Sequence, residues 1–104
     1  MIHYHVWFTF KPAVNESTGL AIAREFMAEL QAGTQVSRCS LLSNMGGPSK
    51  SRLPRYHAFF EFADDEQMEA AFAKKRTEGI HHGAHGKLIE SVAEFHVEVF
   101  REIP

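Results

Sequence analysis

The chain has 104 residues, of which 44% are hydrophobic and 23% are charged, and its formal net charge is -2. This length and composition are typical of one soluble domain spanning residues 1–104. Because the net charge is slightly negative, we do not expect the positive surface that binds phosphates, and nucleic-acid binding is not expected. No apolar run reaches the length of about 18 residues that spans a membrane, and no secretory leader pattern is recognised. With one cysteine, Cys39, a cytoplasmic protein without disulfides is expected.

The first expected element is a strand over residues 1–11, because apolar and less apolar side chains alternate strictly there. Pro12 ends it, since proline has no N–H to donate to a β-ladder. An apolar helical face over residues 20–32 predicts an amphipathic helix that packs one side on a sheet. Asn15, or a hydroxyl residue just after it, is the candidate N-cap of this helix.

Two further strands are expected in the middle of the chain. The pattern over residues 35–44 is the weaker of the two, and residues 56–62 alternate clearly. The glycine-containing segment 46–51 between them is expected to be a flexible loop. It matches no phosphate-binding glycine motif.

A second helix is expected to begin at Asp64, which has the spacing of a capping box with Gln67, and to end at Gly79. A short helix over residues 81–90 and a last strand over residues 92–100 follow. The order β-α-β-β-α-β, with one short insertion, predicts an α+β ferredoxin-like fold, an antiparallel sheet with helices on one face. In this topology the first strand lies between the third and the fourth.

The second face of that sheet gathers imidazoles, carboxylates and aromatic rings. The imidazole, charged and aromatic residues placed there are His3, His5, Trp7, Arg55, His57, Phe59, Glu61, Glu94, His96, Glu98 and Phe100. Cross-strand neighbours lie about 5 Å apart, so these side chains are close enough to touch. The face exposes much aromatic surface, which favours a homodimer that packs it against a second copy and encloses a polar pocket.

Three segments resemble motifs of the stress-responsive A/B barrel domains, a family of dimeric α+β barrels. Residues 5–12 (HVWFTFKP) resemble that family's H-x-V-x-F-K-x-K strand, and residues 60–66 (FEFADDE) resemble its F-x-d-x-e passage. Residues 82–85 (HGAH) resemble its H-P-x-H motif. The resemblance covers nearly the whole chain and implies a dimeric α+β barrel built from ferredoxin-like protomers.

The family's plant polyketide cyclases close rings without metal or cofactor, and their working histidines correspond by this resemblance to His5, His57 and His85. The position of the tyrosine that the cyclases also use holds Gly79, and the motif proline is replaced by Gly83. The resemblance therefore implies the fold and a ligand pocket rather than that particular ring closure.

The leading hypothesis is cofactor-independent acid–base chemistry on a small carbonyl or aromatic compound. His57 is expected to act as the base with His5 as its partner, because imidazoles titrate near neutral pH, and His85 is expected to close the pocket. Glu94 or Glu98 would orient an imidazole. The residues expected to line the ligand are Trp7, Arg55, Phe59, His82, Glu94, His96 and Glu98.

Four other interpretations stay open. The histidines are also consistent with an inactive pocket, or with a non-enzymatic dimer that binds a ligand or stabilises a partner. A third interpretation is a metal site built on His81 or His82 with His85, although ligand spacing of this kind is common by chance and no metal is assigned. The fourth is a cofactor-free monooxygenase, suggested by Trp7 on the same face, by analogy of fold.

Overall fold

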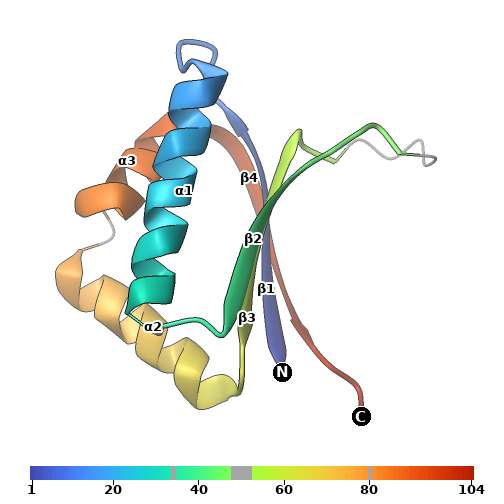
Figure 1. Ribbon diagram of the computed structural model, residues 1–104, viewed down its shortest axis with the longest axis vertical. Helices are drawn as coiled ribbons and strands as arrows, with labels where there is room; N and C mark the ends of the chain where they lie inside the picture. Colours follow the sequence, from blue (N-terminus) through green and yellow to red (C-terminus); the bar gives the residue numbers. More distant parts are fainter. Residues whose placement is uncertain (34, 48–52, 80) are drawn as a thin grey trace.

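The computed structural model describes residues 1–33, 35–47, 53–79 and 81–104. Its elements, in chain order, are β1 (Ile2–Phe10), α1 (Glu16–Ala32), β2 (Arg38–Ser43), β3 (Tyr56–Phe62), α2 (Asp65–Glu78), α3 (Gly83–Ser91) and β4 (Val92–Arg101). The strands form one antiparallel sheet in the order β2-β3-β1-β4. All three helices lie on one side of it (Figure 1). This is the predicted ferredoxin-like fold, with α3 as the short insertion.

Side-chain caps set where the two long helices begin. The Asn15 side-chain oxygen accepts hydrogen bonds from the backbone N–H groups of Ser17 and Thr18, at 3.0 and 3.4 Å. The Asp64 carboxylate accepts one from the backbone N–H of Gln67 at 2.8 Å. The Gln67 side chain accepts in return from the N–H of Ala63 at 2.7 Å, one residue before the position of a standard capping box.

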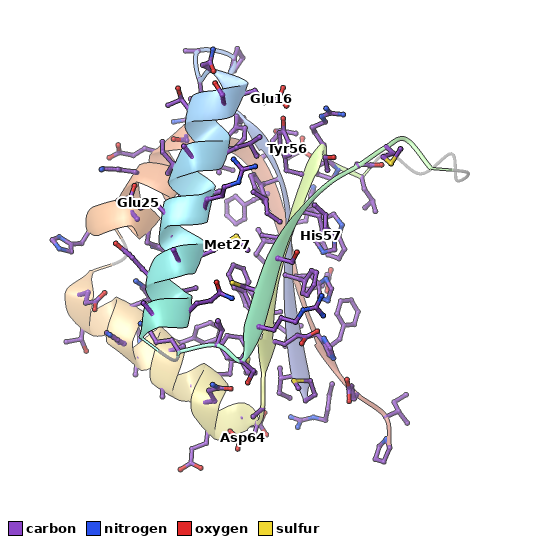
Figure 2. All side chains as sticks on the ribbon, viewed as in Figure 1. Glu16, Glu25, Met27, Tyr56, His57 and Asp64 are labelled. Carbon is purple, nitrogen blue, oxygen red and sulfur yellow. The ribbon has the colours of Figure 1, made fainter. Side chains whose placement is uncertain are left out.

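The core lies between the sheet and the helices, as the alternation predicts. Buried residues of β1 and β3 meet buried residues of α1, and α2 adds Ala71. Figure 2 shows Met27 of α1 directed toward the sheet. Its large buried members include Ile2, Phe8, Phe26, Met27, Leu30, Tyr56, Phe60 and Phe62. Because each strand alternates, the residues between these face away from the helices.

Strand β4 differs from expectation, because the helices do not cover its apolar side. Phe95, Val97 and Val99 point to the same side of the sheet as the core, yet they are 66%, 38% and 50% exposed. The helices pack over the other three strands, and β4 lies at an edge of the sheet. The helices lie on one face of the sheet, as predicted, but they do not extend over β4, which is exposed on both faces.

Two further expectations concern the segment between α1 and β3. Strand β2 covers Arg38–Ser43 and is shorter than the expected 35–44. In the expected loop 46–51, Gly46 and Gly47 are described, and residues 48–52 lie outside the described part of the chain.

None of the described helices is both long and apolar enough to cross a membrane.

Candidate functional site

The strand register brings the predicted histidine and aromatic residues of β1 and β3 together. Trp7 lies directly opposite His57, and His5 lies opposite Phe59. All four side chains are half-buried and lie on the sheet face that points away from the helices, which we call the imidazole face. Figure 2 shows His57 on this side of the sheet.

His5 and His57 are diagonal neighbours on the imidazole face and contact each other through ring nitrogens. His5 Nδ1 lies 2.7 Å from His57 Nε2, a hydrogen-bond distance. One of these nitrogens must carry a proton and the other must be bare, so at least one ring is neutral. When both rings are neutral, either tautomer leaves the pair with one bare nitrogen and one N–H at its outer ends. We call His5 and His57 the imidazole pair.

Aromatic rings fix the orientation of the imidazole pair. Trp7 stacks on His57 with ring centroids 4.6 Å apart and planes at 15°. Phe59 stacks on His5 at 5.7 Å and 26°, and Phe100 meets His5 edge-on at 5.2 Å and 83°. Stacked and edge-on contacts of this kind restrict ring rotation. These ring contacts therefore hold the pair in one arrangement. No described contact joins a carboxylate to either ring.

The surroundings of the pair favour its neutral form. Burial lowers the pKa of His57, and a positive charge on His5 lowers it further. Burial is also the main cause that lowers the pKa of His5, a charge on His3 adds to this, and Glu61 acts in the opposite direction. A neutral imidazole near pH 7 is the form that accepts a proton.

Glu94, His96 and Glu98 of β4 lie on the imidazole face, but no described hydrogen bond or ion pair joins them to the imidazole pair. Glu98 lies opposite His5, and His96 lies opposite Trp7. Glu94 contacts His96, with Oε1 to Nε2 at 3.2 Å, and both side chains are about 60% exposed. Glu94, one of the two carboxylates expected to orient an imidazole of the pair, therefore contacts His96 instead, and Glu98 remains the candidate opposite His5.

Three predicted site residues lie elsewhere, and the most important is His85. Its ring packs on Phe26 of α1, with centroids 5.0 Å apart, on the helix side of the sheet. The whole sheet therefore separates His85 from the imidazole pair. The expectation that His85 closes the same pocket is wrong within the protomer, because α3 packs against α1 rather than against the uncovered face.

His82 and Arg55 also lie away from the pair. His82 is the N-cap residue of α3 and lines a shallow hollow with Arg76, Gly79 and His81. The Arg55 guanidinium lies 4.0 Å from a Glu16 carboxylate oxygen and donates to the Asn44 carbonyl oxygen at 3.4 Å. Both are predicted to line the ligand, and neither contacts His5 or His57 in any described interaction.

His3 and Glu61, which are not among the predicted site residues, lie beside the pair on the imidazole face. His3 is opposite Glu61 across the strands, with Nδ1 and Oε1 3.8 Å apart. His3 Nε2 lies 2.9 Å from Glu102 Oε1. The same alternation that places His5 and His57 also places these residues, so the signal is present in the sequence.

No described residues form a cluster of three or more histidine, cysteine or acidic side chains suited to a metal ion. Cys39 is half-buried on the helix side of β2, and burial raises the pKa of its thiol. A raised thiol pKa disfavours the nucleophilic thiolate.

Solved structures of similar fold come from several organisms. A protein of Arabidopsis thaliana has a TM-score of 0.76 and 10% identity, over 100% of this chain and 97% of its own. A DABB family protein with a ferredoxin-like fold from Mesorhizobium loti has a TM-score of 0.65 and 21% identity, over 99% and 97%. A dimeric ferredoxin-like protein of unknown function from Jannaschia sp. CCS1 has a TM-score of 0.59 and 17% identity, over 98% and 100%. At these identities the likeness shows the fold alone, which is ferredoxin-like.

Sequence comparison gives one further result. A family model described as a family of unknown function (DUF6614) matches residues 1–104. No curated protein sequence matches the chain.

Proposed function

Because the chain belongs to the DUF6614 family, whose description names no activity, we propose its function from the imidazole face. The protein forms a homodimer through this face and uses the imidazole pair for acid–base chemistry on a small carbonyl or aromatic compound. The observation that carries the proposal is the 2.7 Å contact between His5 Nδ1 and His57 Nε2. A neutral pair offers both a base and an N–H donor, which is what proton transfer at a carbonyl compound needs.

The proposed step is abstraction of a proton from the carbon next to a carbonyl group. The bare outer nitrogen of the pair takes the proton, the C–H electrons form a carbon–carbon double bond, and the carbonyl π electrons move to oxygen. The outer N–H at the other end of the pair donates a hydrogen bond to that oxygen. Return of the proton to carbon, or attack of the enolate on a second carbonyl, completes isomerisation or ring closure.

The proposed homodimer rests on the apolar surface that a single copy exposes. Leu42 and Phe100 on the imidazole face are 44% and 49% exposed, beside the half-buried Trp7 and Phe59. Phe95 adds exposed apolar surface on the other side of β4. Large apolar side chains exposed together on one face of a sheet, as Leu42 and Phe100 are here, typically mark an interface. The similar protein from Jannaschia sp. CCS1 is described as dimeric.

Dimerisation would also supply the pocket. In the protomer the hollows described lie at Arg76, Gly79, His81 and His82 and at the end of β1, away from the imidazole pair. Two imidazole faces turned toward each other would enclose both pairs between aromatic walls. Exclusion of water there strengthens the hydrogen bonds that stabilise a developing enolate.

The proposal is tested by hydrogen–deuterium exchange at the α-carbons of hydroxyacetone and acetophenone, followed by proton NMR in D₂O at pD 7.5. The wild-type protein is expected to accelerate exchange of at least one probe, and H57Q is expected to lose at least 90% of that acceleration, since one acid–base group contributes about 10²–10⁴ in rate. The matched control is H81Q, which removes an imidazole far from the pair. Absence of acceleration with both probes, or full activity in H57Q, would overturn the acid–base function.

A non-enzymatic dimer is the second candidate, and one observation favours it. The inner nitrogens of His5 and His57 already satisfy each other, and both rings are stacked on aromatic neighbours. Such a cluster is also suited to the centre of a stable interface. This candidate predicts that H57Q weakens dimerisation or ligand binding while neither probe ketone exchanges faster with the wild type.

A further inference from the structure

A row of charged and titratable side chains crosses the sheet next to the imidazole pair. Arg38 on β2 lies opposite Glu61 on β3, and Glu61 lies opposite His3 on β1. Glu61 Oε1 is 3.4 Å from Arg38 Nη1 and 3.8 Å from His3 Nδ1. Glu102, just after β4, completes the row through its 2.9 Å contact with His3. We call these four residues the charged row.

The inner members of the charged row are shielded from water. The Glu61 side chain is 17% exposed and that of His3 is 23% exposed, whereas Arg38 and Glu102 are more than 60% exposed. Charges removed from water act over longer distances than exposed ones, because the surrounding medium screens them less. Glu61 and His3 are therefore the members of the row best placed to influence a neighbouring imidazole.

Glu61 and His3 both lie beside His5, so His5 is the imidazole whose protonation they influence. The His3 and His5 rings have centroids 6.2 Å apart on one face of β1. Glu61 is the next residue after Phe59 on the same face of β3, and Phe59 stacks on His5. A negative charge at Glu61 stabilises a protonated His5, and a positive charge at His3 destabilises it. The two neighbours act in opposite directions on the same ring.

We propose that Glu61 and His3 are positioning residues that set, with opposite signs, whether the imidazole pair holds one additional proton. This inference rests on the proposed function for its role in proton transfer. The charged and titratable groups that face or flank His5 directly are His57 and Glu61 on β3, His3 on β1 and Glu98 on β4. Two more act indirectly: Arg38 on β2 contacts Glu61, and Glu102 contacts His3.

The test is NMR titration of the imidazole nitrogens in protein labelled with ¹⁵N-histidine, from pH 4.5 to 8.5. E61Q is expected to lower the titration midpoint of His5 by a few tenths of a pH unit, and H3Q is expected to raise it by a similar amount. E25Q is the matched control, because Glu25 is exposed on the outer side of α1 (Figure 2). Midpoints that stay unchanged, or that move in the same direction in both variants, would overturn the inference.

A second variant keeps the test valid if loss of the Glu61 charge disturbs folding. R38Q removes an exposed cation that touches Glu61 and not His5, so Glu61 should act more strongly and the His5 midpoint should rise. A midpoint that falls in R38Q would also contradict the inference. The titration needs no substrate, so its outcome is independent of the ketone-exchange experiment. If the midpoints shift as expected but neither ketone exchanges faster, the proposed function is refuted and the inference is retained. If ketone exchange is accelerated but the midpoints do not shift, the inference is refuted and the proposed function is retained.

Discussion

Trp7 and His57 lie directly opposite each other on β1 and β3, and their rings stack at 4.6 Å with an angle of 15°. Trp7 is the only tryptophan in the chain. A protonated imidazole in contact with an indole ring quenches its fluorescence more strongly than a neutral one. Trp7 also stacks on His5, with ring centroids 5.6 Å apart and planes at 19°, so its fluorescence reports on the protonation of the imidazole pair and most directly on that of His57, the closer ring.

The first prediction follows from this stack. Tryptophan fluorescence should fall on acidification with a midpoint below 6.5, because burial lowers the pKa of His57. In H57Q the transition should lose most of its amplitude, while H81Q should behave as the wild type. A midpoint above 6.5, or an unchanged transition in H57Q, would contradict the geometry of the stack.

The second prediction concerns stability against pH. The pKa values of both His5 and His57 are lowered in the folded protein, chiefly by burial. Between these lowered values and 6.5 the unfolded chain binds more protons than the folded one, so the free energy of unfolding should fall as the pH falls through this window. Urea unfolding at fixed protein concentration, at pH 7.5 and pH 5, measures the change. The doubly substituted variant H5Q/H57Q should lose less unfolding free energy between these two pH values. An equal or larger loss would show that the pH dependence of stability does not come from His5 and His57.

The third prediction concerns assembly. Light scattering after gel filtration should give the wild type twice the protomer mass of 11.8 kDa. Introducing a charge with L42K or F100K should weaken the dimer on the order of tenfold or more, because an unpaired charge at an apolar interface is costly. M45K is the control, since Met45 is 94% exposed beyond the end of β2. A wild-type monomer, or equal dissociation in all three variants, would exclude the imidazole face as the interface.

The fourth prediction separates His85 from the imidazole pair. Because the sheet lies between them, H85Q should retain ketone exchange where H57Q loses it. Loss of the ring contact with Phe26 should cost about 0.5–1.5 kcal/mol of stability, measured by thermal unfolding. Loss of exchange in a folded H85Q protein would return His85 to the site and would require a second copy to bring it there.

Alternation along the strands is enough to predict much of the imidazole face. A period of two fixes the face on which a side chain lies, so the sequence pattern alone places Trp7, His57 and Phe59 together, and the strand register agrees. The same rule places His3 and Glu61 on that face, but their role depends on distances between strands. Those distances follow from register, which no single strand reveals.

The order of the elements, the ferredoxin-like topology and the composition of the imidazole face can be predicted from the amino-acid pattern, because helix and strand periods are local properties of the chain. Packing in three dimensions brings His5 Nδ1 to His57 Nε2, turns Arg55 toward Glu16 and places His85 on Phe26. These contacts depend on rotamers and on which side of the sheet α3 packs. Both are settled by packing between segments distant in the chain, which local periodicity does not specify.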